Sequence, residues 1–133
     1  MVSFGARFWK DYDLECEVRK SNGDGCVRIF FRAAPVKKYE LSLGTKQGHL
    51  LSYIAGSEPH TIRSMYGSLT TGEWYKVRIS ARDARIRCYV NQRKLFEIDD
   101  RRAPDGPVGL GFWDASGRYR NIKVTGPDGK ALW

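Results

Sequence analysis

The chain has 133 residues, which is the length of one domain large enough to bury its own core without disulfides or metal. Its apolar share of 41% and charged share of 29% are ordinary for a globular domain, and no apolar run approaches the roughly 20 residues of a membrane-spanning helix. The net charge of +8 is compatible with acidic partners, but no run of five basic residues exists, so we interpret it as a basic surface.

Alternation of apolar and polar residues dominates the sequence, and the 3.6-residue period of a helix is nearly absent. In the segment 12–18, Leu14, Cys16 and Val18 fall on one face and acidic residues on the other. The turn-forming residues Ser-Asn-Gly-Asp-Gly at 21–25 would join this strand to the next one.

Further strands follow at the spacing of 8–12 residues that is typical of sandwiches and barrels. We expect them at 26–33, 37–44, 48–56, in a short part of the polar stretch 57–72, and at 73–83, 85–91, 95–99, 108–114 and 119–126. Simple alternation cannot place both Tyr119 and Ile122 inward, so the last strand should contain a β-bulge. About ten short strands, each with one buried face, predict an all-β antiparallel fold.

The cysteines and histidines indicate neither a disulfide framework nor a zinc site. Cys16, Cys26 and Cys88 are odd in number and form no C-x-x-C pair, so we expect three free thiols. His49 and His60 have no spacing typical of zinc ligands. His60 lies in a long loop that we expect at 56–72, at the rim of a site.

Two neighbouring strands present charged residues on the face that points away from the core. Arg28, Phe30 and Arg32 fall on this face of strand 26–33, and Glu40 and Ser42 fall on the same face of the next strand. These side chains are either a solvated face with a cross-strand ion pair or the floor of a binding site.

Trp113 is a second candidate on an outward face. It alternates with the apolar residues of 108–114 and is preceded by Gly109 and Gly111, whose small size would let a flat ligand reach the indole ring. Alternatively the ring covers the glycines beneath a loop. Tyr53 and Tyr89 are also outward in phase.

The order of these features resembles the concanavalin A-like lectin/glucanase group of jelly-roll sandwiches. More narrowly, it resembles the bacterial family of 3-keto-disaccharide hydrolase domains, which is close to laminin-G-like and fructan-binding modules. The resemblance rests on the stretches YDLECEVR, GDGCVRIFFRA, YELSLG, GEWYKVRISARDARIRCYVNQRKLFE and GPVGLGFWDASGRYRNIKV, which lie within roughly residues 8–125. It implies a single jelly-roll domain over 1–133, a larger multidomain parent protein, and sugar binding near Arg32 and Glu40.

The sequence departs from the pattern of this family in three ways. It is shorter, which suggests trimmed loops. Gln92 and Arg93 follow Asn91 where the family usually has Asn-Gly, so we expect another turn type there. Gly111 and Trp113 stand where the family often has Gln and His, which argues against inherited catalysis.

We therefore predict a carbohydrate-recognition module. Sugars offer apolar C–H faces and many hydroxyls, so their sites combine a flat aromatic ring with fixed donors and acceptors. The predicted ligand-binding residues are Arg28, Phe30, Arg32, Glu40, Trp113 and His60. Laminin-G-like relatives sometimes bind calcium, but NGDGC at 22–26 lacks the full series of ligands, so we expect no cofactor or metal.

Two alternatives remain open from the sequence. One is an enzyme that acts on a 3-keto disaccharide through two carboxylates about 5–9 Å apart, with Glu40 and Asp114 as candidates. The other is a protein-interaction module that contacts other domains of the parent protein. We see no nucleic-acid signature and no membrane segment. No signal peptide is visible either, so the location stays open.

Overall fold

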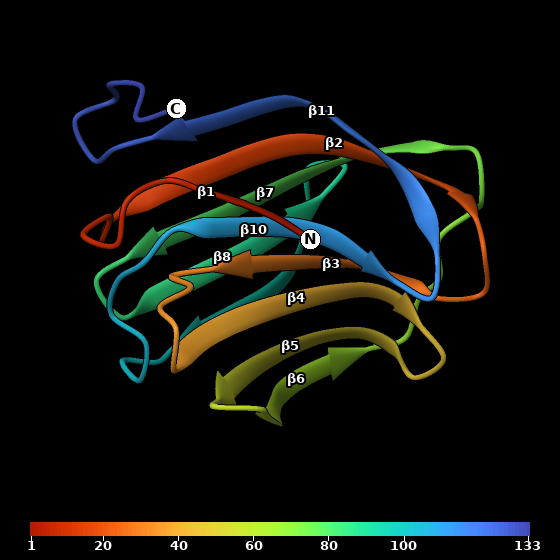
Figure 1. The fold of residues 1–133 in the computed structure, drawn as a ribbon, viewed down its shortest axis with the longest axis horizontal. Helices are drawn as coiled ribbons and strands as arrows, with labels where there is room; N and C mark the ends of the chain where they lie inside the picture. The colour runs from red at the N-terminus through yellow and green to blue at the C-terminus, as the bar shows by residue number, and fades with distance from the viewer.

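A computed structural model describes residues 1–133 as two antiparallel β-sheets without any helix (Figure 1). The six-stranded sheet, called sheet A, has the order β1-β10-β3-β4-β5-β6, and the five-stranded sheet B has the order β11-β2-β7-β8-β9. The strands are β1 (Val2–Phe4), β2 (Tyr12–Asn22), β3 (Cys26–Phe31), β4 (Lys37–Thr45), β5 (Gly48–Ala55), β6 (Glu58–Met65), β7 (Trp74–Arg82), β8 (Arg85–Val90), β9 (Arg93–Asp99), β10 (Val108–Trp113) and β11 (Ser116–Thr125). The predicted all-β sandwich is confirmed.

The core lies between the two sheets and takes every second residue of most strands. Leu14 and Val18 of β2 and Ile79 of β7 are fully buried there, opposite Ile29 and Leu41 of sheet A. Each such side chain stabilises the fold by about 1.5–3 kcal/mol relative to an exposed one. The predicted inward phases of these strands are therefore confirmed.

Three features of the chain differ from the predicted elements. β1 was not predicted, and β6 is a full edge strand of eight residues paired with β5 rather than a short strand in a loop. The turn at 21–25 joins β2 to β3 as predicted, and it crosses from sheet B to sheet A. Tyr53 was predicted to point outward, but its ring lies in the core cluster beside Tyr39.

Two local features of the backbone were addressed by the predictions, the bulge of β11 and the turn between β8 and β9. The register of β11 against β2 shifts between Arg120 and Lys123, which confirms the predicted bulge. The β8–β9 loop consists of Asn91 and Gln92, with φ of 49° and 69°. Two residues at positive φ are the signature of a type I′ hairpin turn, so the prediction of another turn type was wrong.

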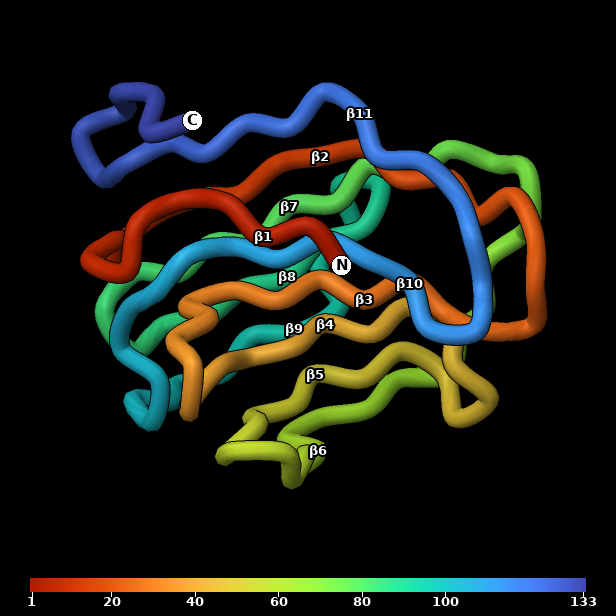
Figure 2. The backbone as a smooth tube through the Cα atoms, viewed as in Figure 1, coloured from red at the N-terminus to blue at the C-terminus, as the bar shows by residue number.

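All three cysteines are free thiols, as predicted, and all three are buried. The backbone trace shows the N-terminal segment lying along β10 at the edge of sheet A (Figure 2). Because the fold has no helix, it offers no helical segment long and apolar enough to cross a membrane.

Candidate functional site

The candidate site is the outer face of sheet A, the face turned away from the core. Along this face Arg28 is paired with Ser42, and Phe30 is paired with Glu40. On the next strand Ser52 lies opposite Glu40. The alternation that buries the other face of β3 and β4 thus brings these polar residues into one continuous patch.

A bidentate ion pair forms the centre of the patch. Arg28 Nε donates to Glu40 Oε2 at 2.7 Å and Nη2 donates to Oε1 at 3.1 Å, while Ser42 Oγ donates to Oε2 at 2.6 Å. The Glu40 side chain is 8% exposed and the Arg28 side chain 32%. The bonds to Glu40 raise the pKa of Arg28, although partial burial opposes this. A fork of this kind fixes the guanidinium plane and leaves its outer N–H groups free to donate to a ligand.

Phe30 lies beneath this pair as a support. Its ring is 6% exposed, with the Arg28 guanidinium 4.9 Å from the ring centroid and the Lys38 ammonium 5.8 Å away. Two cations therefore cover the ring by cation–π contacts. Phe30 belongs to the patch, but the ring itself is not open to a ligand.

Trp113 lies at one end of the patch, opposite Cys26, and is 60% exposed. It borders a hollow of about 300 Å³ that is also lined by Asp24, Cys26, Thr45, Lys46 and Gln47. The hollow thus combines an open aromatic ring with polar side chains from two turns. This is the mixture that a sugar ring requires.

Gly25 fixes the backbone beneath this hollow. Its N–H donates to the carbonyl oxygen of Asp114 at 2.8 Å, and a Cβ at this position would lie 1.6 Å from the carbonyl oxygen of Trp113. Only glycine permits so close an approach. Met1 packs over Gly109 and Gly111, the two glycines that precede Trp113 in β10. It thereby occupies the space beside these glycines that the sequence suggested for a ligand.

A second hollow lies at the opposite end of the patch. It is lined by Arg28, Phe30, Lys38, Glu40, Ile54 and Pro59. The ion pair thus lies between two depressions, one aromatic and open, the other more basic and apolar.

Cys26 faces the same patch as a neutral thiol. Burial raises the pKa of its thiol above the ordinary value, and the charge of Glu40 adds to this rise. The side chain is 6% exposed, so it serves as a small apolar filler between Trp113 and the ion pair.

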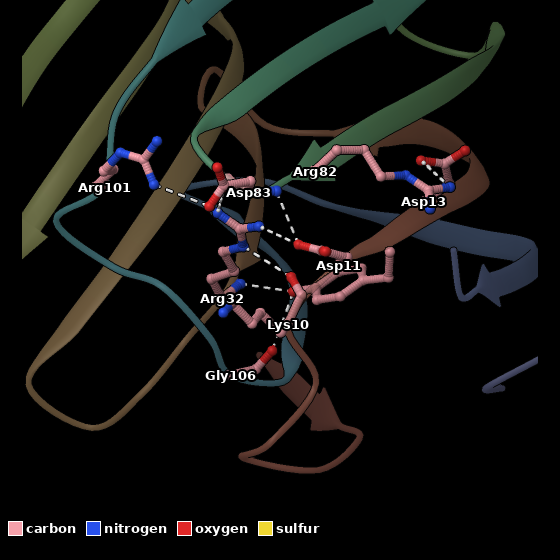
Figure 3. Close-up of polar contacts among 9 residues, drawn as sticks. Lys10, Asp11, Asp13, Arg32, Arg82, Asp83, Arg101 and Gly106 are labelled. Carbon is pink, nitrogen blue, oxygen red and sulfur yellow. Dashed lines mark hydrogen bonds and ion pairs between the residues drawn. The ribbon is translucent and has the colours of Figure 1, made fainter. Parts of the chain in front are cut away.

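Arg32 does not join the patch, because its guanidinium contacts Lys10, Asp11 and Asp83 instead (Figure 3). Its φ of 44° turns the chain out of the strand, and its guanidinium is buried at one end of the sandwich. There it donates to the carbonyl oxygens of Lys10 and Asp83 at 3.0 and 2.7 Å, and to Asp11 Oδ1 at 3.3 Å. These contacts satisfy the side chain within the fold, so the structure separates Arg32 from the residues with which the sequence grouped it.

His60 is also separated from the patch. It is exposed on edge strand β6, opposite Tyr53, and its ring stacks on the Tyr53 ring with centroids 6.4 Å apart. Because Tyr53 belongs to the core face of sheet A, His60 lies on the other side of the sheet from Arg28 and Glu40.

Glu40 and Asp114 are the two carboxylates considered for catalysis. Glu40 lies at the centre of the patch and Asp114 at the end beside Trp113. Glu40 is paired with Phe30, and Asp114 follows Trp113, which is paired with Cys26. Four residues of strand separate these positions, which is roughly 13 Å. Both oxygens of Glu40 also accept hydrogen bonds from Arg28 or Ser42. Nothing in this arrangement specifically favours a glycosidase pair.

No group of three or more His, Cys, Asp or Glu side chains in the structure is arranged to hold a metal ion. The polar residues around Trp113 were missed from the sequence. Thr45, Lys46 and Gln47 were recognisable only as a turn before Gly48. Their approach to Trp113 depends on the order of strands in sheet A, which single-strand patterns do not reveal.

Comparisons with known proteins agree with the fold. The family model of the 3-keto-alpha-glucoside-1,2-lyase-like domain matches residues 5–125. No curated protein matches the sequence.

Several solved structures are similar in fold at low sequence identity. The carbohydrate-binding module CBM66 from Bacillus subtilis has a TM-score of 0.79 at 19% identity, over 86% of this chain and 74% of that chain. Galectin LEC-6 from Caenorhabditis elegans has a TM-score of 0.70 at 10% identity, over 91% and 89%. Domain 4 of the arabinanase AbnA from Geobacillus stearothermophilus, solved in complex with arabinotriose, has a TM-score of 0.63 at 14% identity, over 98% and 67%.

Proposed function

The chain belongs to the 3-keto-alpha-glucoside-1,2-lyase-like domain family, and from this membership and the geometry of sheet A we propose that it is a glycan-binding module. The observation that carries the proposal is the fixed Arg28–Glu40 pair on an outer sheet face, next to a hollow whose Trp113 ring is 60% exposed. Similarity in fold to proteins described as a carbohydrate-binding module and a galectin supports the same function.

In the proposed complex the apolar face of one sugar ring packs on Trp113. The outer N–H groups of Arg28 donate to hydroxyls of the glycan, and Glu40 keeps the guanidinium plane in place. Lys46 and Gln47 contact the hydroxyls of the sugar in the hollow beside Trp113. Because the pair and the backbone around Gly25 are already ordered, little side-chain entropy is lost on binding.

The enzymatic alternative has no specific observation in its favour, because Glu40 is engaged by Arg28 and Ser42 and lies about four strand residues from the position of Asp114. The same holds for a protein-interaction module. No feature of sheet A specifically supports either of these two alternatives.

Binding to trisaccharides of glucose, fructose and arabinose, measured by isothermal titration, tests the proposal. Trp113→Ala should weaken binding of the best trisaccharide about tenfold or more, because the stacking surface is lost. The matched control is Trp133→Ala, because Trp133 is similarly exposed, at 58%, but its ring packs against Phe4 instead. The control should bind like the unmodified protein. Equal affinities of Trp113→Ala and Trp133→Ala would contradict the assignment of the site.

A further inference from the structure

The outer face of sheet B concentrates most of the positive charge of the chain. Alternation opposite the core places on it ten basic side chains, namely Arg19, Lys76, Arg78, Arg82, Arg85, Arg87, Lys94, Arg118, Arg120 and Lys123. The same face carries five acidic ones, Asp13, Glu15, Glu17, Glu97 and Asp99. A net five of the chain's eight positive charges therefore lie on one sheet face.

Half of these basic side chains are neutralised within the face. Arg82, Arg85, Arg87, Lys94 and Arg120 each form an ion pair with a carboxylate. The other five have no carboxylate within 4.0 Å, and all lie on the neighbouring strands β11, β2 and β7: Arg19, Lys76, Arg78, Arg118 and Lys123. The unpaired charge is thus gathered on one half of the sheet.

The charges on this half alternate across the strands. Glu15 on β2 is paired with Lys123 on one side and Arg78 on the other. Glu17 lies in the same way between Arg120 and Lys76. Two shallow hollows meet at Glu15 and Lys76, one extending toward Tyr89 and the other toward Lys123. With strands about 4.8 Å apart, cations and carboxylates therefore alternate at about this interval across the three strands.

The aromatic rings of this face are covered by arginines. Trp74 has the Arg120 guanidinium 3.7 Å and the Arg19 guanidinium 4.9 Å from its ring centroid. The Arg78 guanidinium lies 4.1 Å from the centroid of Tyr89. These cations cover the two rings, so the rings are not free to stack on nucleobases.

We propose that the outer face of sheet B, around Glu15 and Lys76, binds an acidic polysaccharide. Its carboxylate or sulfate groups pair with the free cations, and its hydroxyls donate to Glu15 and Glu17. A nucleic acid fits less well, because its continuous phosphates would lie against both glutamates and its bases would find no open ring. This surface is separate from the glycan site of sheet A and does not depend on it.

The test compares polymers that share one backbone. Carboxymethyl-dextran, unmodified dextran and a single-stranded DNA oligonucleotide are titrated against the protein at about 50 mM and about 300 mM salt. The variant Lys76→Gln/Lys123→Gln removes two exposed, unpaired charges from the face. The control Lys37→Gln/Lys130→Gln removes two exposed charges elsewhere, so both variants have the same net charge.

We expect carboxymethyl-dextran to bind far more tightly than dextran and to weaken at the higher salt. The affinity of Lys76→Gln/Lys123→Gln should fall about fivefold to tenfold and that of the control by less than about twofold. Equal losses in the two variants would overturn the proposal, since net charge alone would then govern binding. Tighter binding of the DNA than of carboxymethyl-dextran at equal salt would also overturn it, in favour of a nucleic acid. Equal affinity for dextran and carboxymethyl-dextran would exclude a role for charge.

Discussion

Arg32 is the largest of the fully buried side chains, and its bonds join three separate segments of the chain. The guanidinium contacts Lys10 and Asp11 before β2 and Asp83 in the β7–β8 turn, while its own backbone N–H donates to the Tyr12 hydroxyl at 2.7 Å. The Tyr12 hydroxyl in turn donates to the carbonyl oxygen of Gly106 at 3.1 Å. Figure 3 shows how these contacts close one end of the sandwich.

Replacing Arg32 by methionine should therefore lower the free energy of unfolding by about 3 kcal/mol or more, because buried carbonyls and Asp11 lose their donor. Denaturant unfolding measures this. Arg101→Met is the matched control, since Arg101 pairs with Asp83 at 2.9 Å but its side chain is 72% exposed. The control should change stability by less than about 0.5 kcal/mol. Similar decreases in the free energy of unfolding for both variants would contradict a special contribution of the buried Arg32 to stability.

Residue patterns predicted Arg28 and Glu40 as neighbours but misplaced Arg32. Alternation holds only while a strand continues, and β3 ends at Phe31. The next residue adopts φ of 44°, which reverses the direction of its side chain. Nothing in the run Phe-Phe-Arg-Ala signals this turn. Similarly, alternation correctly predicted that Phe30 and Trp113 point outward. It could not predict that Arg28 and Lys38 cover the Phe30 ring while Trp113 stays exposed.

At the scale of elements, the β8–β9 hairpin has an unfavourable residue in its turn. Gln92 adopts φ of 69°, a conformation that costs a residue with a Cβ about 1 kcal/mol. Gln92→Gly should thus raise the free energy of unfolding by about 0.5–1 kcal/mol, which denaturant unfolding can measure. Gln47→Gly in the β4–β5 turn is the control, because Gln47 is not among the residues at positive φ and its replacement should destabilise. Destabilisation by both substitutions would contradict the assigned turn.

The β4–β5 hairpin should make stability depend on pH through His49. Its Nδ1 accepts the Gly44 N–H at 3.0 Å, and burial lowers the pKa of the imidazole below its ordinary value of 6.5. The unfolded chain therefore takes up a proton at higher pH than the folded protein does. The contribution of neutral His49 is complete above about pH 6.5 and is lost as the pH falls toward the lowered pKa of the folded state.

Unfolding free energies at about pH 7.5 and about pH 5.5 test this linkage. The decrease at the lower pH should shrink in His49→Gln, which removes the titrating imidazole. His60→Gln removes the exposed histidine of β6 and should leave the decrease as it is. An unchanged decrease in His49→Gln would contradict the role of this group.

Most strands could be predicted because one of their faces is apolar and the other polar, as in β2 and β7. β5 could not be oriented in this way. Both of its faces carry apolar residues: Leu51 and Tyr53 on one, Leu50 and Ile54 on the other. The fold buries Leu51 and Tyr53 in the core. The bulge of β11 was predictable because its apolar residues break the period of two.

At the scale of the whole molecule, the two outer faces differ in chemistry. Sheet A presents one fixed ion pair, two hollows and an open indole ring. Sheet B presents a basic field with covered aromatic rings. Sequence patterns could not separate these two faces, because the assignment of consecutive strands to different sheets depends on packing rather than on local pattern.

We propose that sheet A binds a glycan at Trp113 and the Arg28–Glu40 pair. Amide chemical shifts of the 15.2 kDa chain, followed by NMR during titration with the tightest-binding neutral trisaccharide, test this site residue by residue. We expect perturbed amides at 25–30 in β3 and the residue before it, at 38–48 in β4 and its turn, and at 111–115 around Trp113, with none on β8 and β9. Perturbations confined to sheet B, or to the buried end around Arg32, would contradict it.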